Sequence, residues 1–187
     1  MSAQPMQGRG LSLWWLPPPA VGERLQGVID ALASRLGSPP FRPHVTVEGG
    51  LAGAPEALIQ TLDATPATRE SPLLRQVGVG TAASWNRLLY LELERTTPVA
   101  MARVEICVAL GRTVAPSSFQ PHLSLAYGSL PPTSRQAMVD GLRLALPPFH
   151  PVALALVDTR GEVADWWELH RWPLSAAPVT GAAEMES

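Results

Sequence analysis

One short pattern occurs twice in this chain, and it constrains the fold more than any other feature of the sequence. Residues 41–47 read FRPHVTV, and residues 119–125 read FQPHLSL. From the histidine onward, both segments alternate polar and apolar residues, which is typical of a strand with one buried face. Each proline directly precedes its histidine, a position that suits the first residue of a strand. The pattern therefore predicts a duplicated fold in which each half contributes one such strand.

The alternation places a histidine and a hydroxyl on the same face of each strand. His44 and Thr46 share a face in the first segment, and His122 and Ser124 share one in the second. Residues two apart on a strand lie about 6.5–7 Å apart, so both side chains can contact one small tetrahedral group. For one copy alone, a structural histidine is the simpler interpretation. For two copies in the same context, we interpret the four residues as one site, which forms if the two strands lie side by side.

The size, charge and composition of the chain narrow the possible ligands. It has 187 residues, of which 46% are apolar, and a formal net charge of −2. Long nucleic acid normally needs a basic surface with many phosphate contacts, so we do not expect it as a partner, whereas a small phosphorylated molecule fits. All basic residues are arginine, so no lysine can form a Schiff base. Cys107 is the only cysteine, which excludes a multi-cysteine metal site and predicts a buried, inert thiol.

The ends of the chain differ from its middle. Residues 1–10 and 175–187 are small and polar without periodicity, and we expect them to be flexible. Residues 11–174 are predicted to form a single domain. No segment resembles a signal peptide or is long and apolar enough to cross a bilayer. We therefore expect a cytoplasmic monomer with no membrane partner.

Hydrophobic periodicity predicts most of the elements between the two motif strands and around them. Strands are predicted at 11–16, 74–80, 88–93, 152–157 and 166–172, and helices at 21–36, 55–64 and 99–110. Gly37 is a candidate cap for the first helix, and Asn86 falls in a predicted turn. Thr133 and Gln136 form a T-x-x-Q pattern, which indicates a capping box before a fourth helix. The order strand, helix, motif strand, helix thus occurs twice.

The paired motifs resemble those of the two-histidine phosphoesterase superfamily, and within it the cyclic phosphodiesterase branch. The match extends to LSLW at 11–14, GT at 80–81 and PHLSLAYG at 121–128, and covers about residues 11–174. The resemblance implies an α+β, bilobal, duplicated fold with pseudo-twofold symmetry. It also implies mostly antiparallel sheets flanked by helices, with an active-site cleft between the two lobes.

The resemblance further implies metal-independent hydrolysis of small cyclic phosphates to monoesters, with no cofactor. The substrates would be nucleoside 2′,3′-cyclic phosphates or ADP-ribose 1″,2″-cyclic phosphate. His44 and His122 would be the catalytic acid and base, with His122 as the base and His44 as the acid. Thr46 and Ser124 would hold the phosphoryl group, since either hydroxyl can donate to it. The sequence by itself does not distinguish the roles of the two histidines.

Three aromatic residues and one arginine are lesser candidates for contact with the substrate. Tyr127 matches a tyrosine of the resembling enzymes, and either contacts the ligand or packs at a strand end. Trp14 and Trp85 can stack on a base, with Trp85 favoured of the two, although core packing explains most of the tryptophans. Arg42 precedes the first motif histidine, and we interpret it as a surface residue because Gln120 takes its place in the second motif.

Other functions remain open at this stage. An RNA-end-processing enzyme, such as a 2′–5′ RNA ligase-like protein or an oligonucleotide phosphodiesterase, would need a basic groove beside the site. A non-catalytic nucleotide-binding module would be favoured by loss of a motif histidine, and both are present. A metal site at His44 and His122 lacks carboxylate or cysteine partners at useful spacing. His150 and His170 lack the motif and are predicted to be structural.

Overall fold

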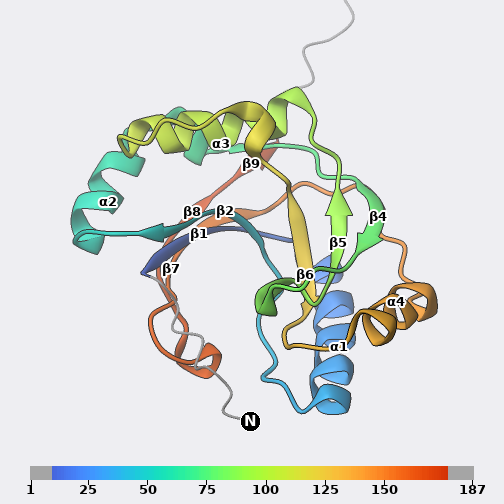
Figure 1. Cartoon of the computed structure of the whole chain (residues 1–187). Coiled ribbons are helices and arrows are strands. Elements are labelled where there is room, and N and C mark those ends of the chain that lie inside the picture. Colours follow the sequence, from blue (N-terminus) through green and yellow to red (C-terminus); the bar gives the residue numbers. More distant parts are fainter. Residues whose placement is uncertain (1–9, 177–187) are drawn as a thin grey trace, which may run out of the picture.

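The computed structural model describes residues 10–176, which form one antiparallel sheet flanked by helices (Figure 1). The strands of the seven-stranded sheet lie in the order β4-β5-β6-β2-β1-β7-β8. Their bounds are β1 Leu11–Leu16, β2 Val45–Leu51, β4 Gln76–Gly80, β5 Leu89–Leu93, β6 His122–Ala126, β7 Ala153–Asp158 and β8 Trp167–Pro173. The α-helices are α1 Pro19–Leu36, α2 Pro55–Asp63, α3 Thr97–Ala109 and α4 Pro132–Gly141. Two short strands, β3 Glu70–Ser71 and β9 Ser175–Ala176, form a separate parallel pair.

The sheet consists of two similar halves that meet at the motif strands. In each half a strand, a helix and a motif strand follow one another, as β1-α1-β2 and as β5-α3-β6. The motif strands β2 and β6 are neighbours in the middle of the sheet and run antiparallel, with Val45 opposite Leu123. The α+β, duplicated fold predicted from the repeated motif is therefore confirmed, and the two halves share one continuous sheet.

The helices are exchanged between the halves. Helix α1, which connects the strands of the first half, packs against β6 of the second, and α3 packs against β2 of the first (Figure 1). This exchange explains the alternation in the motifs. Val45 and Val47 of β2, and Leu123 and Leu125 of β6, are buried in the main core. The histidines and hydroxyls alternate with these residues and so face the opposite side of the sheet.

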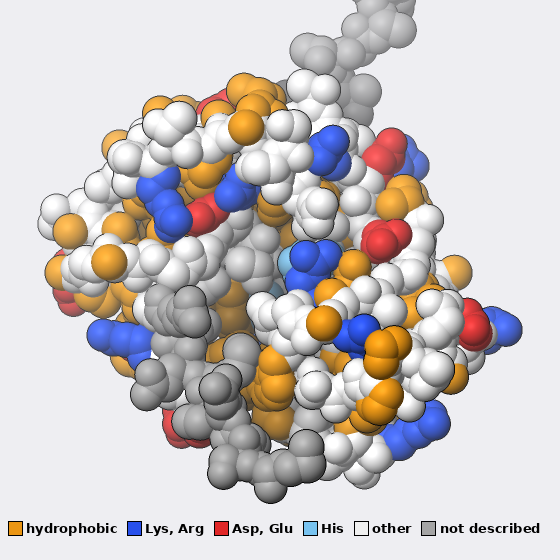
Figure 2. All heavy atoms as spheres, in the orientation of Figure 1, with side chains coloured by type: hydrophobic (Ala, Val, Ile, Leu, Met, Phe, Trp, Pro, Cys, Tyr) orange, Lys and Arg blue, Asp and Glu red, His pale blue; other side chains and the backbone are white. Residues whose placement is uncertain are grey.

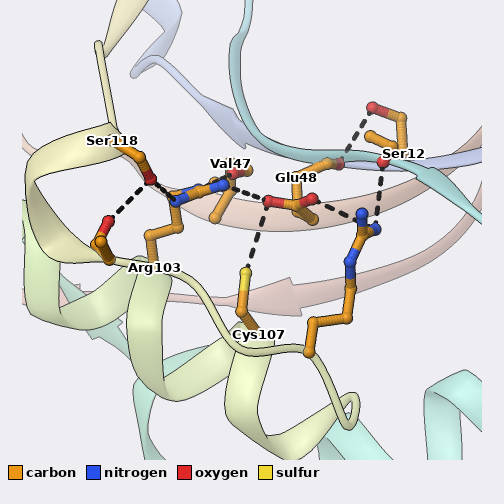
Figure 3. Close-up of polar contacts among 9 residues, drawn as sticks. Ser12, Val47, Glu48, Arg103, Cys107 and Ser118 are labelled. Atoms are coloured by element: carbon orange, nitrogen blue, oxygen red, sulfur yellow. Dashed lines mark hydrogen bonds and ion pairs between the residues drawn. The ribbon is translucent and has the colours of Figure 1, made fainter.

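A buried ion-pair cluster anchors α3 to β2 (Figure 3). A register shift between β1 and β2 occurs beside Glu48, whose carboxylate lies 2.7 Å from Arg103 and 3.1 Å from Arg112. The Cys107 thiol lies 3.4 Å from the same carboxylate. Burial and the nearby negative charge raise the pKa of Cys107 to about 11, so the thiol is protonated at neutral pH. The prediction that Cys107 is buried is confirmed, and its raised pKa favours the inert role that was predicted for it.

Several local predictions differ from the structure. The capping box at Thr133 is wrong, because α4 begins one residue earlier and no side chain caps it. Pro132 occupies its first turn and has no N–H that needs a cap. Helix α1 likewise begins at Pro19, before the predicted start, and ends as predicted at Gly37, whose φ is 64°.

The predicted flexible ends, 1–10 and 175–187, lie mostly outside the described residues. Within them, Gly10 immediately precedes β1, and Ser175–Ala176 forms β9, so the folded chain continues past the predicted boundary. Within residues 10–176, no helix has the length and apolar character needed to cross a membrane.

Candidate active site

The two motif histidines are held in the same way by the backbone. The Nδ1 atom of His44 lies 2.7 Å from the carbonyl oxygen of Arg42, and that of His122 lies 3.0 Å from the carbonyl oxygen of Gln120. A carbonyl oxygen only accepts hydrogen bonds, so each Nδ1 carries the proton and each Nε2 is left as a free acceptor. Both rings therefore present a base nitrogen away from their anchoring carbonyl. The residue two positions before each histidine thus orients the imidazole through its backbone carbonyl. The sequence does not reveal this role, because it does not depend on the type of side chain.

The pairing of β2 with β6 brings the two imidazoles near each other. Val45 and Leu123, which directly follow the two histidines, lie opposite each other, and the positive charge of a protonated His122 contributes to a lower pKa of His44. Burial is the larger cause, and together these effects lower the pKa of His44 to about 4. Burial also lowers the pKa of His122, with a smaller contribution from the charge of Arg87. Both rings are therefore neutral at pH 7 in the unliganded protein.

The two motif hydroxyls differ in their hydrogen bonding. Ser124 is buried and its Oγ donates to the carbonyl oxygen of Asn86 at 2.8 Å. Thr46 makes no side-chain hydrogen bond with any residue between 10 and 176, so its hydroxyl can donate to a ligand. In the sheet, Thr46 lies opposite Trp14 and Ser124 lies opposite Tyr90. The two half-sites are thus alike in their histidines and different in their hydroxyls.

Trp14 stacks directly on one of the motif histidines. Its ring is nearly parallel to that of His44, with centroids 3.7 Å apart and an interplanar angle of 11°. Its Nε1 donates to Ser12 Oγ at 2.9 Å, and Trp166 packs edge-on against it at 5.8 Å. The imidazole occupies one face of the Trp14 ring, and only 4% of the residue is exposed. The contact follows from the register that places Trp14 opposite Thr46.

Tyr127 and Trp85 form an aromatic cluster with the phenylalanine of the first motif. The ring of Tyr127 lies on that of Phe41 at 3.7 Å, and the ring of Trp85 packs against Tyr127 at 4.9 Å. Tyr127 is 3% exposed, and burial raises its pKa well above the usual range of a tyrosine. Trp85 is half-buried and lies in the short 3-10 turn η2 (Trp85–Arg87), between β4 and β5 where the turn at Asn86 was predicted.

The remaining candidates are accounted for by local contacts. Arg42 pairs with Glu168 at 2.7 Å, and Glu168 also binds Arg171. His150 Nδ1 lies 2.9 Å from the Ser71 carbonyl oxygen, and His170 packs against the ring of Trp172. These arrangements are those of structural residues. Among residues 10–176, no group of three or more His, Cys, Asp or Glu side chains is placed to hold a metal ion.

His122 lines one surface pocket, and Trp14, the ring that stacks on His44, lines another. A pocket of about 290 Å³ includes His122, Tyr90 and Arg87 in its lining, and a smaller one of about 90 Å³ includes Trp14, Phe41 and Trp166. In Figure 2 a histidine is visible in a hollow near the middle of the face, directly beside a basic side chain. The imidazole of His122 is thus open to a surface pocket, whereas His44 is buried and lines neither of these two pockets.

Comparison with known proteins identifies the family. A family model described as the 2′-5′ RNA ligase superfamily matches residues 17–161, a span that includes both motifs. The chain belongs to this superfamily. The two-histidine phosphoesterase resemblance predicted from the motifs is therefore confirmed.

This member of the 2′-5′ RNA ligase superfamily is similar to a plant enzyme in sequence and to two bacterial proteins in fold. A cyclic phosphodiesterase of Arabidopsis thaliana is 25% identical over 167 residues, which cover 84% of this chain and 90% of the plant protein. E. coli LigT, solved in complex with 3′-AMP, has a similar fold with a TM-score of 0.55 at 14% identity, over 92% of this chain and 99% of LigT. TT0787 of Thermus thermophilus gives a TM-score of 0.54 at 17% identity, over 88% and 97% of the two chains. The cyclic phosphodiesterase relative and the family indicate a phosphoesterase.

Proposed function

We propose that this protein hydrolyses small cyclic phosphates to phosphomonoesters by acid–base catalysis with His44 and His122, without a metal ion. The observation that carries the proposal is the matched anchoring of the two imidazoles. In both, a backbone carbonyl holds Nδ1–H and leaves Nε2 free. Two such nitrogens on neighbouring strands suit a reaction that removes one proton and delivers another.

The proposed reaction is attack of water on a cyclic phosphodiester. One imidazole takes a proton from the water as its oxygen bonds to phosphorus. The bond from phosphorus to one ring oxygen breaks, and the other imidazole protonates that oxygen, which leaves a monoester and a free hydroxyl. Thr46 would donate to a non-bridging oxygen, whose charge must be supported in the transition state, and Ser124 would do so only after its hydroxyl rotates away from the Asn86 carbonyl.

Burial suggests which histidine has which role. His44 is the more deeply buried ring and has its pKa lowered to about 4, so it is held in the neutral, proton-accepting form. His122 is partly exposed, and its charged form is the less strongly disfavoured by desolvation. We propose His44 as the base and His122 as the acid, the reverse of the assignment implied by the family resemblance. The negative charge of a bound cyclic phosphate would raise the pKa of both rings and help the pair to acquire its single proton.

Several observations support small nucleotides as the substrate class. The Arabidopsis thaliana relative is a cyclic phosphodiesterase, and LigT has been solved with 3′-AMP, ATP and NADP⁺. The net charge of −2 disfavours a long polyanion. We therefore propose nucleoside 2′,3′-cyclic phosphates and ADP-ribose 1″,2″-cyclic phosphate as substrates, bound by a monomer.

The direct test is an assay of both cyclic substrates in the presence of EDTA, with identification of the products. His44→Ala and His122→Ala are each expected to lower kcat by about 10²–10⁴-fold, the usual contribution of a general acid or base. His170→Ala is the matched control, because it removes an imidazole that packs on Trp172. The proposal is wrong if wild type hydrolyses neither substrate, or if the motif variants match the control. Activity abolished by EDTA would overturn the metal-free mechanism.

Processing of RNA ends is the second candidate, and the family description favours it. It predicts that a short RNA ending in a 2′,3′-cyclic phosphate is a better substrate than the mononucleotide. The comparison is made by measuring kcat/KM for both. A higher value for the mononucleotide would support the first proposal, and a clearly higher value for the RNA would support the second.

A further inference from the structure

Arg87 lines the same pocket as His122, and its guanidinium lacks the ion pair or hydrogen bonds that usually hold a partly buried arginine. It forms no ion pair and no side-chain hydrogen bond with any residue between 10 and 176, and its Nε is buried without a partner. Buried polar groups are normally hydrogen-bonded, so an orphaned guanidinium nitrogen calls for an explanation. The guanidinium lies over the ring of Tyr90, with Cζ 4.5 Å from the ring centroid. Tyr90 in turn packs edge-on against His122 at 5.5 Å.

The backbone that carries Arg87 is tied to the motif strand. The carbonyl of its neighbour Asn86 accepts the hydrogen bond from Ser124 Oγ, and the carbonyl of Trp85 accepts one from Gly128 N–H at 2.8 Å. The carbonyl of Arg87 itself accepts from Ala82 N–H at 2.9 Å. The turn η2 is therefore fixed against β6, and the side chain of Arg87 extends along the face that holds Ser124 and His122.

The other two charged residues of the same pocket lie differently: Arg95 is held by backbone carbonyls, and Glu92 is turned toward the edge strand. Arg95 donates to the carbonyl oxygens of Ser117 and Phe119 at 2.8 and 3.3 Å. Glu92 lies opposite His122 in the sheet, but its carboxylate leans over Gly78 on the edge strand. A side chain at position 78 would clash with it, because a Cβ there would lie 2.6 Å from the Glu92 Oε2 atom. Within the described lining of this pocket, Arg87 is the arginine whose guanidinium makes no hydrogen bond or ion pair with residues 10–176, whereas Arg95 is held by two backbone carbonyls.

The two half-sites also differ in their supply of donors. Thr46 has a free hydroxyl among the described residues, whereas the hydroxyl proton of Ser124 is directed at the Asn86 carbonyl. A phosphoryl oxygen near His44 can accept a hydrogen bond from Thr46, whereas an oxygen near His122 would lack the matching donor. Arg87 lies one residue from that carbonyl and beside His122, and a guanidinium is well suited to bind phosphoryl oxygens.

We propose that Arg87 is a further catalytic residue, which donates hydrogen bonds to the phosphoryl group on the His122 side of the site. This inference rests on the proposed function, because it concerns the same phosphoryl group. It assigns the stabilisation of developing charge in that half-site to Arg87, because the hydroxyl proton of Ser124 is directed at the Asn86 carbonyl. The charge of Arg87 also acts on His122 itself and lowers its pKa, so the residue affects both binding and protonation.

The test is Arg87→Gln, compared with Arg135→Gln as the matched control. Arg135 also has a buried Nε without a partner among the described residues, and it lies on α4, outside the pocket that His122 lines and outside the one that Trp14 lines. Removal of one donor to a transition-state anion typically lowers kcat by about 10²–10³-fold, and we expect that loss for Arg87→Gln with 2′,3′-cyclic AMP. Arg87→Lys, which keeps the charge but not the planar fork, is expected to recover part of it. Arg135→Gln is expected to match wild type.

A binding measurement separates this inference from the proposed function. Inorganic phosphate is titrated into each variant while the imidazole signals of His122 are followed by NMR. We expect weaker phosphate binding in Arg87→Gln and wild-type binding in Arg135→Gln. If wild type hydrolyses no cyclic phosphate but Arg87→Gln loses phosphate binding, the proposed function fails and the role of Arg87 as a phosphoryl ligand stands. Unchanged phosphate binding and unchanged kcat in a folded Arg87→Gln variant would overturn the inference.

Discussion

At the scale of single residues, the protonation of the two histidines decides how activity depends on pH. Both pKa values lie below the ordinary 6.5 of histidine, that of His44 at about 4. The working pair needs one proton, and at pH 7 the unliganded protein holds both rings neutral. We therefore expect kcat/KM to fall as pH rises above the higher of the two values, which lies below 6.5, and to fall again near pH 4.

NMR titration of the imidazole signals provides the direct measurement for this prediction. His122 is expected to titrate at a higher pH than His44, and both rings are expected to carry their proton on Nδ1 when neutral. His44→Gln and His122→Gln assign the signals. A pKa of His44 at or above 6.5, or a neutral ring protonated on Nε2, would contradict the proposed site.

The repeated motif predicted four site residues, but their neighbours could not be predicted in the same way. The carbonyls of Arg42 and Gln120 act through the backbone, so residue type carries no signal for them. The stacking of Trp14 on His44 depends on the register between β1 and β2. Arg87 belongs to no motif and reaches His122 only because η2 folds back onto β6. The carbonyl contacts are local, but the positions of Trp14 and Arg87 depend on long-range pairing, which spacing along the chain does not encode.

At the scale of elements, the contact between α3 and β2 depends on a buried charge. Glu48 and Arg103 have side chains only 9% and 13% exposed. Glu48→Ala would leave the guanidinium of Arg103 buried without its carboxylate, which typically costs about 3–5 kcal/mol. We expect the free energy of unfolding in urea to fall by about that amount. Glu94→Ala is the control, since Glu94 and Arg75 are 46% and 50% exposed and 3.9 Å apart, and should change it by less than about 1 kcal/mol. Equal effects in the two variants would contradict this account.

Periodicity predicted the elements better than their ends or their partners. The helix 21–36 was predicted from its apolar spacing, but its first turn lies in a proline run, where no periodic signal exists. The T-x-x-Q pattern at Thr133 predicted a cap, but α4 already begins at Pro132 and no side chain caps it. The exchange of α1 and α3 between the halves could not be predicted, because an apolar helix face fits the face of either motif strand.

At the scale of the whole molecule, this exchange couples the two halves. The ladder between β2 and β6 has a single registered pair, Val45 with Leu123, so the strands alone join the halves weakly. The helices supply the larger connection, because each covers the motif strand of the other half. Neither half can then keep its core if the other unfolds. The protein is therefore expected to unfold as one cooperative unit, as the single domain predicted for residues 11–174 requires.

A substitution in α1 tests this coupling. Leu25 is fully buried on the face of α1, and Leu25→Ala is expected to lower the free energy of unfolding by about 2–5 kcal/mol. Urea unfolding is followed by far-UV circular dichroism and by tryptophan fluorescence, which reports on Trp85 in η2 and on the other five tryptophans, at 14, 15, 166, 167 and 172, in or beside β1 and β8. In a coupled molecule both signals shift to the same lower midpoint, because loss of packing on β6 also removes the support of β1 and β2. Separate transitions, or a shift of one signal alone, would show that each half folds independently and that the site between them assembles from two autonomous parts.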